Sequence, residues 1–280
     1  MSVRYRLNRL FALDGRCCEV AMDHGVHNEP GFLAGIENLK ATVDLVSDAG
    51  ADALLLSVGQ AALLQDKVGR NKPSLILRSD PTNFYGNPTP AEVFCELLPN
   101  IVEQAMSFDA VSVVVNLLWA PDQPSLHRQC VRNISKLKPQ CERYGLPIIV
   151  EALLMHSGRK NGGYEHYCDT ARSAALVRQG VELGADAIKT DSLNKPDEYY
   201  KIIESATGKP VLLRGGSRVN DKELLSRTHA LIHQGAAGIV YGRNIYQHQY
   251  PARMLKACNA IVHHNAAVAE AEAILNQAGS

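Results

Sequence analysis

Hydrophobic residues gather in eight short runs along the chain, and polar residues, proline or glycine bound most of these runs. Most runs are rich in β-branched residues, which is typical of strands that are buried on both faces. Their average spacing is about thirty residues, the length of one strand-helix-strand repeat. We therefore predict eight strands, at 17–25, 51–57, 74–80, 110–116, 147–154, 185–191, 210–216 and 237–243.

Segments with helical periodicity lie between these runs. Between 35 and 50, one stripe is formed by Ile36, Leu39, Val43 and Val46. A glycine can take the left-handed conformation that closes a helix. Several helical segments run into such a residue before the next strand, namely Gly50, Gly145, Gly184, Gly208 and Gly235. The repeated order of helix, glycine and strand predicts a parallel sheet.

Eight strand-helix units in 280 residues, without a break in composition, favour an α/β fold of one closed (β/α)8 barrel, or TIM barrel. We expect this barrel to form a single domain over residues 1–280. A doubly wound open sheet is the main alternative for the same alternation. In a barrel of this type, catalytic groups sit at the C-terminal ends of the strands and in the loops that follow them.

Composition narrows the classes of partner. The chain has 29 Lys and Arg residues against 29 Asp and Glu residues, so no global field would hold nucleic acid or an anionic membrane. The seven cysteines form no CxxC pair and no metal-ligand spacing, which suits reduced thiols in a cytosol. The start lacks the apolar run of a signal peptide, and no stretch approaches ~18 apolar residues. We expect a soluble, cytoplasmic protein.

Lys189 ends the apolar run of the sixth predicted strand. Burial and a neighbouring cation such as Arg214 both disfavour the ammonium form, so the neutral amine would be able to attack a carbonyl group and form an imine. The alternative is a structural lysine whose ammonium group pairs with Asp23 or Asp191. Under either interpretation, the side chain of Lys189 is expected at the barrel mouth, that is, at the C-terminal end of the barrel.

The last two predicted strands are followed by glycine-rich loops. Gly215 and Gly216 follow Arg214, and Gly242 precedes Arg243. Backbone N–H groups at such glycines approach anions closely, and these two loops commonly hold phosphate in TIM barrels. A plain tight turn is the alternative for one loop alone. Together the loops predict a phosphate site, anchored by Arg214, Arg243 and the glycine amides. With Lys189 they indicate a substrate that carries a ketone and a phosphate.

Four residues are candidates for moving protons or orienting the substrate. Asp23 and His24 end the first predicted strand, although both residue types also serve as caps there. Glu151 lies between apolar residues, so it must point into the mouth or find a buried partner, and burial would raise its pKa. His156 follows in the next loop, where polar residues are more often solvated than catalytic.

These stretches together resemble the class I, Schiff-base aldolases of the archaeal-type fructose-bisphosphate aldolase family, within the set that includes deoxyribose-phosphate aldolase. The matching stretches are "AMDHG", "GADAIKT", "PVLLRGG" and "GIVYGRNIYQ", one per strand end. The resemblance implies imine formation at Lys189 with help from Asp23, and phosphate binding at Gly215, Gly216, Gly242 and Arg243. It also implies a phosphorylated ketose substrate, no metal and no cofactor, and a homo-oligomer, with a decameric ring among the forms.

One stretch departs from that family. Its bisphosphate aldolases typically carry a tyrosine on the fifth strand as proton donor and acceptor, whereas Leu153 stands at the aligned position in "VEALLMHSGRK". Other stretches resemble the branch that acts on phosphorylated autoinducer sugars, which lacks this tyrosine and acts as a thiolase. Our prediction is a metal-independent aldolase for a phosphorylated keto sugar. The alternatives are a thiolase or transaldolase-like synthase that uses the same lysine, and a non-catalytic sugar-phosphate-binding barrel.

Overall fold

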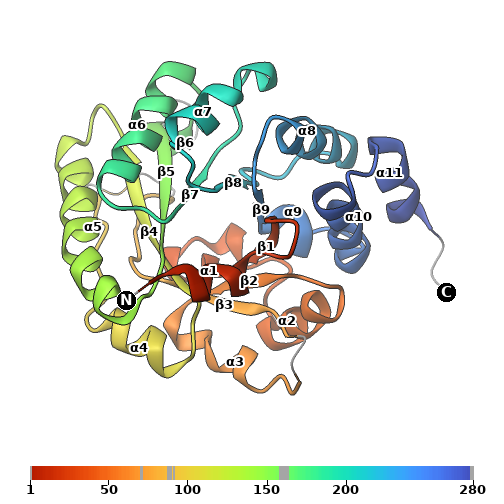
Figure 1. Cartoon of the computed structure of the whole chain (residues 1–280), viewed down its shortest axis with the longest axis horizontal. Coiled ribbons are helices and arrows are strands. Elements are labelled where there is room, and N and C mark those ends of the chain that lie inside the picture. Colours follow the sequence, from red (N-terminus) through yellow and green to blue (C-terminus); the bar gives the residue numbers. More distant parts are fainter. Residues whose placement is uncertain (1, 70–71, 87–89, 91, 158–163, 278–280) are drawn as a thin grey trace.

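In the computed structural model, which describes residues 2–69, 72–86, 90, 92–157 and 164–277, parallel strands close into a barrel (Figure 1). The hydrogen-bonded order is β4-β3-β2-β1-β9-β8-β7-β5, and a further pairing of β4 with β5 closes the ring. The predicted TIM barrel is therefore confirmed, and the open sheet is excluded. The barrel strands are β1 (Cys17–Ala21), β2 (Ala53–Leu56), β3 (Ser74–Arg78), β4 (Ser112–Trp119), β5 (Ile148–Ser157), β7 (Ala187–Thr190), β8 (Val211–Arg214) and β9 (Gly238–Tyr241).

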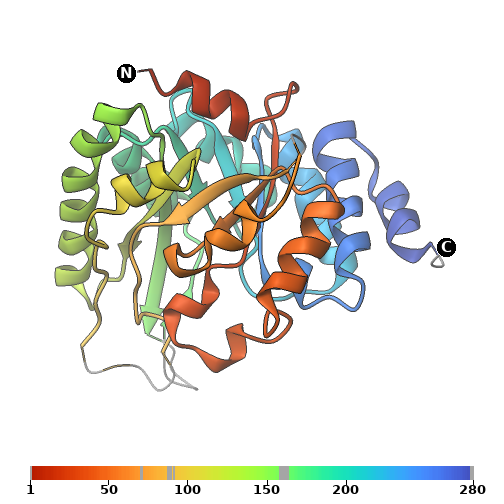
Figure 2. The ribbon, with the colours of Figure 1, turned by 90° about the horizontal axis from the view of Figure 1, so that it is seen from below.

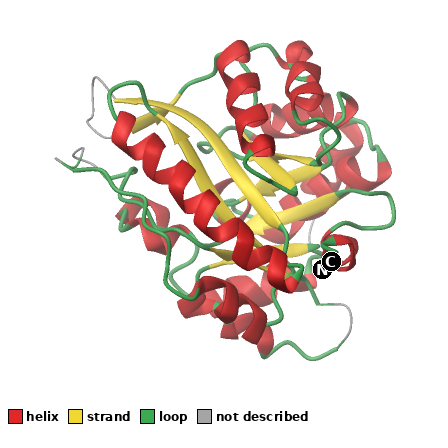
Figure 3. Ribbon diagram, turned by 60° about the vertical axis from the view of Figure 1, so that its left-hand side comes forward, coloured by secondary structure: helices red, strands yellow, loops and turns green. Residues whose placement is uncertain are grey.

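Helices surround this barrel, as Figure 3 shows by the red layer outside the yellow strands. They are α2 (Leu39–Asp48), α3 (Ala62–Gln65), α4 (Ile101–Ser107), α5 (Pro124–Tyr144), α6 (Thr170–Glu182), α7 (Tyr200–Ser205), α8 (Asp221–His233), α9 (Arg243–Tyr246), α10 (Pro251–His264) and α11 (Val268–Asn276). Short 3-10 turns lie at His24–His27, Pro30–Phe32, Val58–Gln60 and Pro196–Glu198. Within the described ranges, no helix combines the length and the apolar character needed to cross a membrane.

The first helix, α1 (Arg4–Leu10), covers one end of the barrel (Figure 2). Its residue Leu10 is buried in a cluster with inward-facing strand residues that include Cys17, Ile149 and Leu212. This helix therefore closes the N-terminal end of the barrel and leaves the C-terminal end for ligands.

Glycines end the helices as the sequence predicts. Gly145, the C-cap of α5, has a φ of 62°, and Gly184, which follows α6, has a φ of 100°. Gly50, Gly208 and Gly235 also have positive φ. The chain therefore turns from helix to strand through the left-handed conformation that glycine adopts without strain.

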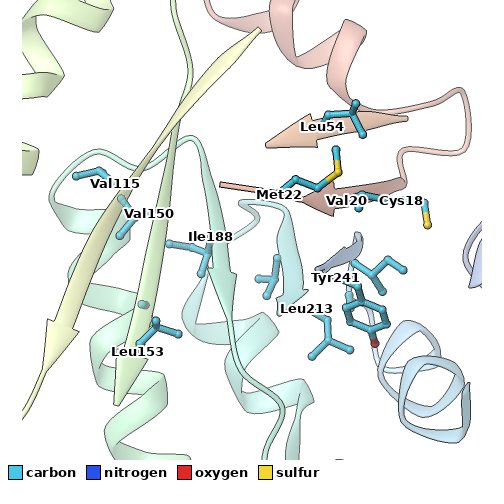
Figure 4. Packing of buried hydrophobic residues seen from close by; sticks show 14 of the residues in the cluster. Cys18, Val20, Met22, Leu54, Val115, Val150, Leu153, Ile188, Leu213 and Tyr241 are labelled. Atoms are coloured by element: carbon cyan, nitrogen blue, oxygen red, sulfur yellow. The ribbon is translucent and has the colours of Figure 1, made fainter. Parts of the chain in front are cut away.

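Alternation along each strand separates two groups of side chains. Val150, Ile188 and Leu213 belong to the layer between the strands and the helices (Figure 4). Their neighbours Ile149, Ala187 and Leu212 belong to the cluster inside the barrel. Because side chains alternate along a strand, Glu151 and Lys189 fall on the inner side with this second group.

One element differs from the prediction. The strand β5 continues to Ser157, and β6 (Tyr164–His166) pairs with its end in an antiparallel arrangement. The sequence predicted a loop directly after residue 154. The paired extension adds a short hairpin beside the barrel mouth.

Candidate active site

Lys189 lies at the C-terminal end of β7 and is almost fully buried, with 4% of its surface exposed. Its Nζ atom is 3.0 Å from Oε1 of Glu151, which occupies the paired position on β5. The sequence suggested Asp23 or Asp191 as possible partners of this ammonium group. The structure instead pairs it with Glu151, because neighbouring inward positions on β5 and β7 bring the two side chains together.

Glu151 is contacted by two further cations. Arg78 Nη2 lies 2.6 Å from Glu151 Oε2, and Arg214 Nε lies 3.2 Å from Oε1. Burial raises the pKa of this carboxyl, but the charges of Lys189, Arg78 and Arg214 outweigh burial and hold the pKa well below its usual value. The predicted rise in the pKa of Glu151 is therefore wrong. Glu151 is an ionised carboxylate that three strands supply with positive charge.

Arg78, at the end of β3, joins Glu151 to Asp23. Its Nε donates to Asp23 Oδ2 over 2.7 Å, and both side chains are buried. Burial tends to raise the pKa of Asp23, yet the neighbouring Arg78 and the other cations lower it to about 2. Asp23 is therefore ionised at the mouth, as a proton acceptor must be. The strand-end sequence contains Arg78, but its bridging position depends on three strands meeting in the barrel.

The two glycine loops lie beside this cluster. Arg243 Nη2 donates to the carbonyl of Gly216 over 3.1 Å, and its guanidinium stacks on Phe32 with 4.7 Å to the ring centre. Arg243 forms no ion pair with a carboxylate in the described part of the chain, and its buried Nε lacks a hydrogen-bond partner there. Burial and the nearby Arg214 lower the pKa of Arg243. Such a guanidinium is available to an anionic ligand.

Gly242 leaves room for the side chain and backbone that pack against it. A Cβ atom at this position would lie 2.6 Å from Cε1 of His24 and 2.7 Å from the carbonyl oxygen of Ala21. His24 packs edge-on against Phe32 and Tyr246, and burial lowers its pKa to about 3. His24 is therefore a neutral imidazole at the mouth.

A cavity that is partly open to solvent joins all these groups. Its walls come from the ends of β1, β3, β5, β7, β8 and β9, together with His27, Phe32 and Tyr85. The lining contains every site residue predicted from the sequence except His156.

The geometry of the site agrees with a comparison of the sequence with models of known protein families. The sequence profile described as "DeoC/LacD family aldolase" matches residues 17–248, the greater part of the chain. The chain belongs to the DeoC/LacD aldolase family. It is an aldolase, and the alternative of a non-catalytic binding barrel is set aside. The match ends before α10, so a single domain over residues 1–280 stays a prediction.

Relatives agree with this assignment. The aldolase is 30% identical to an uncharacterized aldolase of Saccharolobus solfataricus, over 96% of this chain and 97% of that protein. It is 31% identical to the 2-amino-3,7-dideoxy-D-threo-hept-6-ulosonate synthase of Halobacterium salinarum, over 98% of this chain and 95% of that protein.

Solved structures share the fold. An archaeal fructose 1,6-bisphosphate aldolase superposes with a TM-score of 0.78 at 22% identity, over 94% of this chain and all of that one. A Schiff base forming fructose-1,6-bisphosphate aldolase gives a TM-score of 0.76 at 24% identity, over 94% of this chain and 100% of that one. At these sequence identities, the comparison shows a shared fold and nothing further.

Two residues of β5 lie away from the pocket of the aldolase. His156 is exposed and stacks on Tyr167, with ring centres 5.4 Å apart and planes within 5° of parallel. Leu153 is buried in the large hydrophobic cluster and does not line the cavity (Figure 4). Neither residue is placed to exchange a proton with a ligand beside Lys189. Arg159, which the sequence places after this strand, lies outside the described residues.

Sequence reasoning missed a further buried acid. Glu19 is on the inner side of β1 and is 1% exposed, and its Oε2 has no hydrogen-bond partner among the described residues. Burial raises its pKa to about 8, against the attraction of the Lys189 charge. The sequence feature that indicates this buried acid is a single acidic residue inside the apolar stretch "CCEVA".

Tyr85 was also missed, and no strand or helix marks its position in the chain. It lies in the segment between β3 and α4, and its hydroxyl oxygen accepts a hydrogen bond from Arg214 Nη2 over 3.2 Å. Arg214 thereby contacts Tyr85 and Glu151, and its Nη1 lies 3.0 Å from Asp191 Oδ1. These contacts commit Arg214 to protein partners, whereas the sequence expected it to bind phosphate.

Proposed function

We propose that this aldolase is a class I enzyme, in which Lys189 forms an imine with the ketone of a phosphorylated ketose without help from a metal. The observation that carries the proposal is the buried Lys189 amine inside the cavity, 3.0 Å from an ionised carboxylate. An amine must lose a proton before it attacks a carbonyl carbon, and Glu151 is the nearest proton acceptor. The iminium ion then serves as the electron sink for breaking or making the adjacent carbon–carbon bond.

Asp23 supports the same step. Its carboxylate is ionised, lies in the cavity and is held by Arg78. We assign to Glu151 the removal of the ammonium proton, and to Asp23 the proton exchange at the hydroxyl group that leaves as water. Arg78 keeps the two carboxylates apart and oriented, since it donates to both.

The phosphate group of the substrate would lie against Arg243 and the backbone of Gly215, Gly216 and Gly242. Among the residues that the structure describes, Arg243 has no carboxylate partner, whereas Arg78 and Arg214 are both held in ion pairs. His24 is neutral and adjacent, so it is able to donate a hydrogen bond without adding charge. Because phosphate is a dianion, it would supply the missing counter-charge for Arg243.

A transaldolase-like synthase is the second candidate, favoured by the name of the Halobacterium salinarum relative. It would use the same imine on Lys189 but pass the fragment that stays bound to the lysine to a second carbonyl compound. An assay of phosphorylated ketoses with and without an added aldehyde or ketone acceptor separates the two. Release of free aldehyde without an acceptor supports the aldolase, and strict dependence on the acceptor supports the synthase.

Replacement of the lysine tests the proposal. Lys189→Ala should abolish turnover of phosphorylated ketoses while the far-ultraviolet circular dichroism spectrum is retained. Lys40→Ala is the matched control, because Lys40 is an exposed lysine on α2 that pairs with Asp44. Turnover by Lys189→Ala at the rate of the control would refute the assignment. A chelator should leave the activity of the unaltered enzyme unchanged.

A further inference from the structure

The proposed reaction leaves one task unassigned. When a carbon–carbon bond forms, the carbonyl oxygen of the aldehyde becomes an alkoxide and must receive a proton. Among the carboxyl groups that line the cavity, Asp23 and Glu151 are ionised and bound by cations, and the imine step already assigns a proton transfer to each of them. His156 is exposed and stacked on Tyr167, outside the cavity.

Tyr85 brings a hydroxyl group to the same cavity. Its oxygen is 3.2 Å from Arg214 Nη2, and Arg214 Nε is 3.2 Å from Glu151 Oε1. The same Glu151 oxygen is 3.0 Å from Lys189 Nζ. Three contacts, which pass through Arg214 and Glu151, therefore link the phenol of Tyr85 to the reacting amine.

Neighbouring rings fix the phenol in place. The ring of Tyr85 lies edge-on to His27 and to Phe32, with ring centres 4.8 Å and 5.3 Å away, and 6.0 Å from the ring of His166. These contacts leave little freedom except rotation about the C–O bond. A donor held in this way loses little conformational entropy when it meets a substrate.

The hydroxyl hydrogen is free for a ligand. Arg214 donates to the Tyr85 oxygen, so the oxygen acts there as an acceptor. No hydrogen bond from the Tyr85 hydroxyl to an acceptor exists within the described part of the chain. The phenol therefore enters the reaction with a proton that no group of the described residues accepts.

We propose that Tyr85 is a catalytic residue that gives this proton to the aldehyde oxygen during bond formation and takes it back during bond cleavage; this inference rests on the proposed imine mechanism. The enamine carbon attacks the carbonyl carbon, and the C=C electron pair becomes the new C–C bond. The nitrogen lone pair restores the iminium, and the carbonyl π pair moves to oxygen, which takes the proton from Tyr85. The phenolate pairs with Arg214 until a water molecule adds to the iminium carbon; the water oxygen becomes the carbinolamine hydroxyl group, and one water proton returns to the phenolate. Cleavage follows the same steps reversed.

The surroundings suit both states of the phenol. Burial raises the pKa of Tyr85, so the group stays protonated before bond formation. Arg214 is the nearest charge and opposes that rise, while Glu151 and Asp191 add to it and Arg78 reduces it. Burial also lowers the pKa values of His27 and His166, which leaves both flanking rings neutral. Arg214 is thus the cation in contact with the phenolate.

Tyr85→Phe tests the role, with Tyr167→Phe, outside the cavity, as its control. Two readouts are compared for each protein: turnover of the phosphorylated ketose, and the amount of ketose trapped on Lys189 by borohydride. We expect Tyr85→Phe to trap ketose within twofold of the unaltered enzyme and to lose turnover by about 10²-fold or more, the usual contribution of a positioned acid or base. Tyr167→Phe should change neither readout by more than about twofold, as expected for a group that touches no substrate.

The two readouts separate the possible failures. Turnover by Tyr85→Phe within threefold of the unaltered enzyme would overturn the role of Tyr85 and leave the imine mechanism intact. Equal losses of trapping and turnover would also overturn it, because the phenol would then act in binding or imine formation. If the unaltered enzyme traps no ketose at all, the proposed function itself fails, and this inference fails with it.

Discussion

Lys189 and Glu151 occupy paired positions on β7 and β5, and their charged atoms lie 3.0 Å apart inside the barrel mouth. The pair is not isolated, because Arg78 and Arg214 contact the same carboxylate from β3 and β8. The carboxylate of Glu151 thus contacts three cationic side chains, which come from three other strands. The predictions below follow from this arrangement and from the groups around it.

Glu151→Gln should damage both stability and catalysis. Removal of one partner from a buried ion pair typically costs about 3–5 kcal/mol, since the remaining charges stay buried without compensation. The free energy of unfolding, measured in urea, should fall by this amount, and turnover should fall by at least about 10²-fold. Glu142→Gln is the control, because Glu142 is exposed and its contact with Lys138 is long, at 3.6 Å. A change for Glu151→Gln no larger than that of the control would contradict the account.

Glu19 should make stability fall as pH rises. Its pKa is about 8 in the folded protein against 4.5 ordinarily. Between these values the folded state holds a proton that the unfolded state has lost, so a higher pH favours unfolding by up to about 1.4 kcal/mol per pH unit. Glu19→Gln should remove this slope and be the more stable protein at pH 8. Parallel stability curves for the two proteins from pH 5 to pH 8 would rule out the buried, protonated state.

Arg243→Ala should weaken binding of the phosphate group. Loss of a charge-assisted contact should raise KM for a phosphorylated ketose by about tenfold or more. Inorganic phosphate should inhibit the unaltered enzyme and should lose this effect in the variant. Arg253→Ala is the control, since Arg253 stacks on the exposed Tyr250 away from the cavity. If the two variants have equal KM values, Arg243 does not bind the phosphate.

Gly242→Ala should disturb the mouth. The added methyl group would overlap His24 and the Ala21 carbonyl, and such overpacking costs about 1–3 kcal/mol. A lower melting temperature and reduced turnover are expected. Gly59→Ala should be harmless by comparison, because a Cβ atom there meets nothing within 4 Å. Equal melting temperatures for the two variants would show that the space beside Gly242 is not needed.

The sequence was sufficient for the barrel because each strand carries its own signal. A continuous apolar run, such as the one before Lys189, marks a strand buried on both faces, and Gly145 and Gly184 mark helix ends. Strand ends then place Asp23, Lys189 and Arg243 at one mouth without knowledge of their contacts. Membership in the aldolase family agrees with that placement.

The charge state of Glu151 was beyond the reach of the sequence. Its low pKa depends on Arg78 and Arg214, which are 73 and 63 positions away in the chain and meet it only when the barrel closes. A local view shows an acid among apolar residues and predicts the opposite shift. Tyr85 was missed for a related reason. It lies outside the helices and strands, so no periodic pattern in the sequence indicates that it lines the cavity. His156 lies outside the cavity, because β5 continues beyond residue 154 into a hairpin with β6 in which His156 is exposed.

Borohydride trapping tests the central claim most directly. The unaltered enzyme is mixed with candidate ketose phosphates, reduced, weighed as an intact protein and then mapped by peptides. The account predicts one added ketose phosphate per chain, carried by Lys189, and no addition in Lys189→Ala. No adduct with any ketose phosphate, or an adduct on another lysine, would contradict it.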